Sequence, residues 1–172
     1  VLGVANATDG MQLFLIASGI KKNSEIIVSS HTMVATASAV NFAGYKPVPV
    51  EFGKDMLICP DSIEKSITSK TKALLVTHLN GRTCDMDRIL KICNKYNLTL
   101  FEDAAQALGS RYKGKHAGTF GLASSISLYP AKILGCFGDG GLVLTNNTKL
   151  YNKLKKIRNH GINEKTKKID YW

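Results

Sequence analysis

The 172-residue chain contains no hydrophobic run that approaches the ~18 to 20 apolar residues of a membrane-spanning helix. Its N-terminus also lacks the basic and then apolar pattern of a secretory signal peptide. Internal repeats and low-complexity tracts are absent from the sequence. Because 44% of the residues are hydrophobic, the chain can bury a core of its own. We therefore expect a globular, cytoplasmic protein without a membrane partner.

The sequence has only four cysteines. Cys59, Cys84, Cys93 and Cys136 form no C-x-x-C pair, and no histidines accompany them at the spacing of a zinc site. The pattern supports neither a disulfide scaffold nor a metal centre. We expect no bound metal, and we expect the four cysteines to be reduced packing residues.

Acidic residues are few, with 13 Asp and Glu against 23 Lys and Arg, so the formal charge is +10. About a third of the basic residues lie between Lys149 and Lys168. Nucleic-acid binding is one interpretation, but no aromatic platform, zinc knuckle or helix-turn-helix pattern accompanies the cluster. A solvated helix face is the simpler interpretation. A positive field would also attract a phosphorylated cofactor or a nucleotide-bearing substrate.

Apolar runs alternate with amphipathic segments along the chain, which indicates an α/β fold. A mostly parallel sheet covered by helices on both faces, a three-layer sandwich, fits this order. Prolines mark one strand as an edge strand. Strands are expected at residues 1–5, 26–30, 47–52, 73–79, 98–101, 124–129 and 142–145, helices at 11–18, 32–43, 85–96 and 149–160, and a short helix capped by Asp61.

In such sheets, ligands bind beyond the carboxyl ends of the strands, where two candidate groups fall. Thr8, Asp9 and Gly10 open a predicted helix, so they form either an anion site or an ordinary N-cap. Asp103 ends a buried strand, with Gln106 and two alanines behind it. That carboxylate suits a partner for a protonated ring nitrogen, or it caps a helix.

A third candidate is Lys132, which follows an apolar, strand-like run and precedes several glycines. A pocket that excludes water favours the neutral amine of a lysine, which can attack a carbonyl group. Ile133, Leu134 and Phe137 are expected to supply such a pocket. A solvated loop lysine is the alternative. An aldehyde cofactor is the sharper hypothesis.

The three groups together match pyridoxal phosphate, which needs an amine for its aldehyde, an acid for its ring nitrogen and donors for its phosphate. The sequence also resembles the DegT/StrS-type sugar aminotransferases, which are pyridoxal-phosphate enzymes with an aspartate-aminotransferase-like fold. Blocks similar to those of that family occur in its order at residues 6–10, 31–36, 77–81, 102–106, 127–132, 138–141 and 158–161. The resemblance implies the large domain of a fold-type-I enzyme.

For the reacting groups, the resemblance implies that Lys132 is catalytic: it holds the cofactor as a Schiff base and later moves a proton. Asp103 is implied to pair with the pyridinium nitrogen, and Gln106 to bond the ring oxygen of the cofactor. Some members of the family carry a histidine in place of the lysine and dehydrate sugars. Lys132 argues against that variant.

For the remaining cofactor contacts, the resemblance implies that Thr8, the Asp9 amide and Ser127 hold the phosphate. Met33 stands where the family usually has an aromatic residue stacked on the ring. A methionine still offers a polarizable apolar contact. His78 and His160 lie in matching blocks without an assigned role, and we interpret both as packed, hydrogen-bonded histidines.

The implied reaction moves an amino group from an amino acid, typically glutamate, to a keto sugar that is usually attached to a nucleotide. Such reactions serve amino-sugar and surface-polysaccharide biosynthesis. The resemblance also implies a homodimer with shared active sites and no nucleic-acid partner. A catalytically inactive cofactor-binding remnant and a basic nucleic-acid or anion-binding module are the alternatives.

The two ends of the chain give a further expectation. Val1 is not an initiator methionine, and Tyr171 and Trp172 follow a basic stretch without a helix cap or glycine. We expect residues 1–172 to be the cofactor-binding large domain of a longer protein, without its leading segment and its small C-terminal domain.

Overall fold

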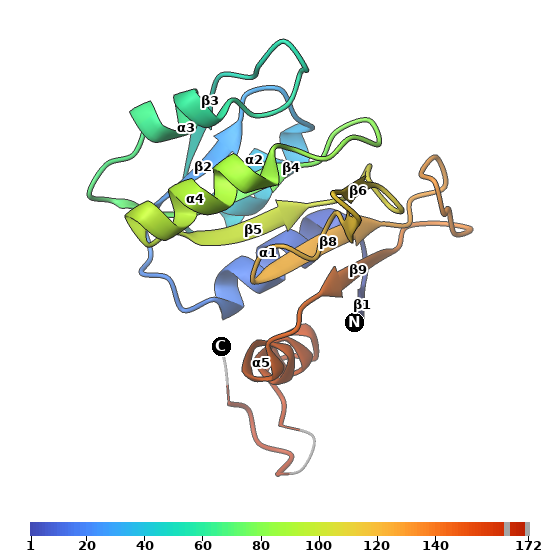
Figure 1. The fold of residues 1–172 in the computed structure, drawn as a ribbon. Helices are drawn as coiled ribbons and strands as arrows, with labels where there is room; N and C mark the ends of the chain where they lie inside the picture. Colours follow the sequence, from blue (N-terminus) through green and yellow to red (C-terminus); the bar gives the residue numbers. More distant parts are fainter. Residues whose placement is uncertain (164–165, 171–172) are drawn as a thin grey trace.

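A seven-stranded sheet lies in the middle of the computed structural model, which describes residues 1–163 and 166–170 (Figure 1). The strand order is β1-β9-β8-β5-β4-β2-β3. All neighbours pair in parallel except β9, which runs antiparallel to β1 and β8. The predicted, mostly parallel sheet is therefore confirmed. The strands are β1 (Leu2–Val4), β2 (Glu25–Ser29), β3 (Lys46–Val50), β4 (Thr71–Thr77), β5 (Thr99–Asp103), β8 (Ala123–Ser127) and β9 (Gly141–Leu144).

Helices cover both faces of this sheet (Figure 1). On β2, Ile26 and Val28 point into the core beneath α1, α2 and α5, while Ile27 points into the core beneath α3 and α4. This period-2 alternation of buried side chains makes three layers. The helices are α1 (Ala7–Ala17), α2 (Val34–Phe42), α3 (Pro60–Lys65), α4 (Met86–Tyr96) and α5 (Thr148–Arg158), and a small hairpin joins β6 (Arg111–Tyr112) to β7 (Lys115–His116).

The starts of helices α1 and α3 differ from the sequence prediction in how they are capped. Helix α1 begins at Ala7, four residues early, because the Asn6 side chain accepts the Asp9 amide at 2.9 Å and caps the helix. Helix α3 begins at Pro60, whose fixed φ suits the first helical position, and Asp61 lies in the first turn instead of capping. The proline-marked strand β3 is at the sheet edge, as predicted.

Two glycines bring the start of α1 against the sheet. A Cβ atom on Gly10 would lie 2.5 Å from Ser125 Oγ, and one on Gly141 would lie 2.6 Å from the Asn6 carbonyl carbon. The Ser125 hydroxyl also donates to the Ala7 carbonyl at 2.9 Å. The N-terminus of α1 is thereby fixed beside the strands β8 and β9.

Helix α5 carries most of the predicted basic cluster. Its apolar side buries Leu150 and Leu154, while Lys149 is exposed and the other lysines of the helix are half-buried. His160, beyond the helix, is exposed and has a left-handed φ of 55°. The packed reading of His160 is therefore wrong. Tyr171 and Trp172 lie outside the described residues.

All four cysteines are free, and burial raises the pKa of Cys84 to about 12 and of Cys93 to about 11. Neither buried thiol ionises readily near neutral pH. Within the described ranges, no helix is long and apolar enough to cross a membrane, and no cluster of His, Cys, Asp and Glu could hold a metal ion.

Candidate active site

A cavity of about 530 Å³ opens at the carboxyl edge of the sheet. Thr77, Asp103 and Ser127 are the last residues of β4, β5 and β8, and all three line it. Parallel neighbouring strands end at the same edge, which explains this convergence. The cavity also collects every residue that the sequence predicted for the site: Thr8, Asp9, Met33, Asp103, Gln106, Ser127 and Lys132.

Asp103 supplies a buried carboxylate to this cavity, with only 3% of the residue exposed. Its Oδ2 accepts the Thr36 hydroxyl at 2.7 Å, and its Oδ1 accepts the Ala105 amide at 3.1 Å. Burial raises the pKa of Asp103, while these two hydrogen bonds and the charge of Lys132 act in the opposite direction. The residues directly after Asp103 form a turn and not a helix, so the helix-cap interpretation is wrong.

Gln106 lies one turn beyond Asp103. Its backbone carbonyl accepts the Gly81 amide at 2.9 Å, and its side-chain Oε1 accepts the Asn80 amide at 3.2 Å. The side-chain oxygen of Gln106 is thus already used as an acceptor within the protein. The side-chain NH₂ group is left to donate to a ligand oxygen in the cavity.

The first turn of α1 supplies donors for an anion. Asp9 donates its amide to Asn6, so that amide already has a protein acceptor. The amides of Ala7 and Thr8 donate to no other group in the described part of the chain. Ser127 Oγ, across from them, accepts the Tyr129 amide at 3.2 Å and keeps its own proton free. Two backbone amides and two hydroxyls, from Thr8 and Ser127, therefore face a cavity at a helix N-terminus.

Lys132 lies on the loop that follows β8. Its amide donates to the Tyr129 carbonyl at 2.8 Å, and its side chain lines the cavity. A Cβ on Gly135 would come within 2.5 Å of the Pro130 carbonyl oxygen, which explains a glycine in this tight turn.

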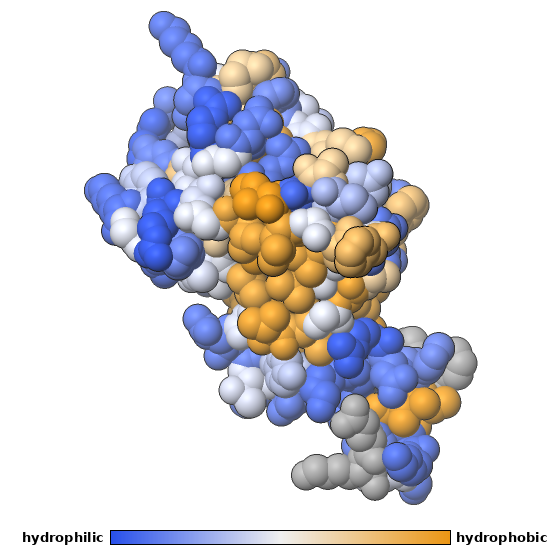
Figure 2. All heavy atoms as spheres, turned by 90° about the vertical axis from the view of Figure 1, so that its right-hand side faces the viewer, coloured by the Kyte–Doolittle hydropathy of each residue, from blue (hydrophilic) through white to orange (hydrophobic). Residues whose placement is uncertain are grey.

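The expected apolar shield around Lys132 is not formed within this chain. Ile133, Leu134 and Phe137 are 67%, 58% and 113% exposed, so the prediction that they wall a pocket is wrong. They lie on the loop that projects to the right in Figure 1, and Figure 2 shows a broad hydrophobic area on that face. The walls of the cavity come instead from α1, the start of α2 and the strand ends.

Met33 precedes the first residue of α2 and is 61% exposed while lining the cavity. Sequence reasoning missed other lining residues, among them Asn6, Thr77, Tyr129 and Asp139. It also missed Thr36, which is fully buried and bonds Asp103. Thr36 and Thr77 stand in blocks that the sequence singled out, but a threonine alone carries no signal of its partner.

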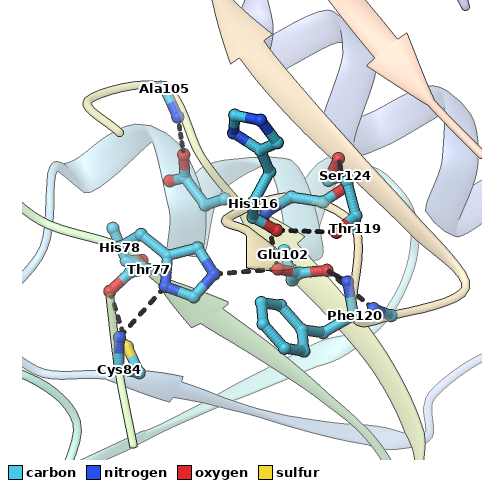
Figure 3. A network of polar contacts seen from close by, with 12 residues as sticks. Thr77, His78, Cys84, Glu102, Ala105, His116, Thr119, Phe120 and Ser124 are labelled. Atoms are coloured by element: carbon cyan, nitrogen blue, oxygen red, sulfur yellow. Dashed lines mark hydrogen bonds and ion pairs between the residues drawn. The ribbon is translucent and has the colours of Figure 1, made fainter. Parts of the chain in front are cut away.

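Behind the site, His78 and Glu102 form a fully buried pair (Figure 3). His78 Nδ1 accepts the Cys84 amide at 3.2 Å, which assigns the ring proton to Nε2, and Nε2 donates to Glu102 at 2.9 Å. The packed, hydrogen-bonded reading of His78 is thus confirmed. Glu102 also accepts the amides of Gly118, Phe120 and Gly121 at 2.6 to 2.7 Å. It anchors the 118–121 loop beneath β5, next to Asp103.

Glu102→Gln should destabilise the folded protein by about 3 to 5 kcal/mol, because an amide group in place of one carboxylate oxygen faces N–H donors and leaves them unpaired in a buried site. The free energy of unfolding from urea titration measures this. Glu64→Gln is the matched control, since Glu64 pairs at the surface with Lys95, and should cost far less. Equal losses for the two variants would contradict the anchoring role of Glu102.

The fold and the cavity define an α/β protein that binds its ligand at the carboxyl ends of parallel strands. Residues 1–172 match the DegT/DnrJ/EryC1/StrS aminotransferase family, and the chain belongs to that family. The family expected from the sequence blocks is therefore confirmed.

Individual relatives agree with this assignment. The chain is 43% identical over 165 residues to a dTDP-3-amino-3,4,6-trideoxy-α-D-glucose transaminase of Streptomyces venezuelae, covering 95% of the chain and 44% of the relative. The structure of DesV from S. venezuelae superposes with a TM-score of 0.91 at 43% identity, covering 95% and 44% of the two chains. NtdA of Bacillus subtilis, solved with bound cofactor PMP, gives 0.89 at 34% identity, covering 99% and 39%. The chain thus spans less than half the length of these relatives.

Proposed function

We propose that the protein is a pyridoxal-phosphate-dependent aminotransferase that moves an amino group from an amino acid, such as glutamate, to a keto sugar carried on a nucleotide. One observation carries the proposal: a single cavity brings together a buried carboxylate, a lysine amine and the open amides of a helix N-terminus. Membership of the family and the dTDP-sugar named for the S. venezuelae transaminase support the substrate class.

The residues of the cavity fit pyridoxal phosphate. A volume of about 530 Å³ is in the ordinary range for a cofactor site. The amides of Ala7 and Thr8 with the hydroxyls of Thr8 and Ser127 would hold the phosphate, and Asp103 would face the ring nitrogen. When bound, the cofactor supplies an aldehyde for amine exchange and an electron-withdrawing ring.

The chain's own groups then have separate tasks. Among the described residues that line the cavity, Lys132 carries the one amine, so its Nζ is the group that moves protons at the reacting carbon. Asp103 supplies a negative charge that favours a protonated nitrogen beside it. The α1 N-terminus and Ser127 fix the anionic end, which orients the ligand between Lys132 and Asp103.

We also propose that residues 1–172 are the large, cofactor-binding domain of a longer cytoplasmic subunit that works as a homodimer with shared active sites. The share of the relatives that the chain covers supports the domain assignment. Ile133, Leu134 and Phe137 form an exposed apolar surface beside Lys132 that a second subunit would cover.

The test mixes the full-length protein with pyridoxal phosphate. We expect a yellow absorbance band that borohydride bleaches, with the pyridoxyl label on the peptide that contains Lys132. A separate sample of the enzyme, not treated with borohydride, is then assayed with glutamate and a dTDP-linked keto sugar. The amino sugar is detected by mass spectrometry. Absence of the band, together with salt-sensitive binding of a DNA duplex, would favour the basic anion-binding module instead. A band without turnover would favour the inactive remnant.

Met33→Phe should tighten retention of the cofactor by at most about tenfold, because an aromatic ring stacked on the cofactor gains roughly 0.5 to 1.5 kcal/mol beyond area burial. A thioether contact already supplies part of that gain. The dissociation rate of the cofactor after dilution measures the change. Strong weakening by Phe would mean that the side chain at position 33 does not face the ring.

A further inference from the structure

Three threonine hydroxyls form a continuous chain that ends on Asp103. Thr77 Oγ1 lies 2.9 Å from Thr32 Oγ1, and Thr32 Oγ1 lies 2.8 Å from Thr36 Oγ1. Thr36 Oγ1 lies 2.7 Å from Asp103 Oδ2. The chain crosses from the end of β4, through the segment before α2, to the end of β5.

The direction of these bonds follows from counting protons. An ionised carboxylate only accepts, so the single hydroxyl proton of Thr36 goes to Asp103. The bond between Thr32 and Thr36 must then use the proton of Thr32, and the bond between Thr77 and Thr32 must use the proton of Thr77. All three O–H dipoles therefore point toward the carboxylate while it carries its charge. Aligned hydrogen bonds of this kind polarise and strengthen one another.

The aligned hydroxyls affect Asp103 strongly because the carboxylate and its donor are buried. Thr36 is 0% exposed, Thr77 is 4% exposed and Asp103 is 3% exposed, while Thr32 is half-buried, so water does not replace the Thr36 donor at the carboxylate. A carboxylate buried this deeply ionises only if donors or positive charges compensate for lost solvent. Apart from the hydroxyl chain, its compensating groups are the Ala105 amide and Lys132.

We propose that Thr36, backed by Thr32 and Thr77, is a positioning residue that keeps Asp103 ionised and oriented toward the cavity. The inference deepens the proposed function, in which that charge stabilises a protonated ring nitrogen. The hydrogen bond from Thr36 to Asp103 also joins the third residue of α2 to the end of β5. The alternative is a merely structural role, in which Thr36 holds α2 against the sheet and does not affect the charge of Asp103.

The first experiment measures the pKa of Asp103 in the cofactor-free, full-length protein, by NMR of ¹³C-labelled aspartate, with the Asp103 signal assigned by its loss in Asp103→Asn. Thr36→Val should raise that pKa by about one to two, the worth of one hydrogen bond to a charged group. Thr36→Ser keeps the donor and should leave the pKa near the wild-type value. Ser38→Ala, on the same helix, is the control for a hydroxyl remote from Asp103.

A second variant keeps the inference testable if Thr36→Val fails to fold. Thr32→Val removes the donor behind Thr36 but leaves the bond from Thr36 to Asp103, so the pKa should rise by a smaller amount. An unchanged pKa in both Thr36→Val and Thr32→Val, or an equal rise in Thr36→Val and Thr36→Ser, would overturn the proposal.

The second experiment adds the cofactor. Thr36→Val should weaken binding of pyridoxal phosphate severalfold, yet leave binding of an analogue with carbon in place of the ring nitrogen unchanged. Equal weakening for both ligands would show a structural role only and overturn the proposal. If the wild-type protein binds neither ligand while the pKa of Asp103 shifts as expected, the hydroxyl chain stands and the proposed function falls.

Discussion

Lys132→Ala in the full-length enzyme should lose amino transfer down to the background rate. Lys132 carries the one amine among the described residues that line the cavity, so no neighbour can replace it. Loss of proton transfer alone costs roughly 10² to 10⁴-fold in rate, and loss of the nucleophile adds to that. Single-turnover assays with an amino acid donor and a keto sugar measure the loss.

Two further variants make the Lys132 result specific. Lys132→Arg keeps a positive charge in the cavity but provides no neutral amine, so it should be as inactive as Lys132→Ala. Lys72→Ala is the control, because Lys72 is exposed, lies outside the cavity and donates to the Ser69 carbonyl. Borohydride reduction should label the Lys72 variant and neither Lys132 variant. Wild-type turnover in Lys132→Ala would remove the central assignment of the site.

Much of this site follows from the sequence because its residues stand at strand ends. Asp103 follows an apolar run that predicts a buried strand, and parallel neighbouring strands end at one edge of the sheet, where Asp103 and Ser127 both lie. Thr8, Asp9 and Gly10 stand where turn chemistry meets a helix start, which indicates either an anion site or an ordinary N-cap, although the helix begins earlier than its apolar pattern indicates. Local pattern and sheet topology therefore place Thr8, Asp9 and Asp103 at the cavity, whereas Met33, Gln106 and Ser127 are expected there from the family resemblance, and Asn6, Thr77, Tyr129 and Asp139 are not expected.

The supporting contacts could not be predicted in the same way. Thr36 meets Asp103 across 67 positions, and Glu102 meets the amides of a loop 16 to 19 positions further on. Such pairings depend on how α2 and the 118–121 loop pack, which no periodicity encodes. Ile133 illustrates the opposite error: an apolar side chain near a lysine suggests a shield, whereas the loop geometry turns it outward.

Asp103→Asn should lower the rate of amino transfer by at least about 10²-fold, the usual cost of losing one aligned electrostatic contact in an enclosed site. A neutral amide cannot favour a protonated ring nitrogen as a carboxylate does. Retention of the cofactor should fall much less, because Lys132, Ser127 and the α1 amides are unchanged. Asp87→Asn, at an exposed carboxylate that pairs with Lys113, is the control and should keep full activity.

Asp103→Asn should also change how the stability of the folded protein depends on pH. Burial raises the pKa of Asp103 in the folded protein above its ordinary value of 3.8, so the folded state holds this proton to higher pH than the unfolded state does. Where the folded state binds more protons, the free energy of unfolding falls as pH rises. The stability of the wild-type protein therefore carries an Asp103 contribution that is fully present below pH 3.8 and declines as pH rises through the raised pKa.

Asp103→Asn has no such contribution, so its stability relative to wild type should increase with pH across that window. Urea titrations of the cofactor-free proteins at a series of pH values measure the difference, with Asp87→Asn as reference. The hydrogen bond from Lys113 lowers the pKa of Asp87, so the sign there is reversed: that variant should lose stability relative to wild type as pH rises. A relative stability of Asp103→Asn that fell with pH would mean that Thr36, Ala105 and Lys132 outweigh burial. The carboxylate would then be ionised in the folded protein at lower pH than in the unfolded chain.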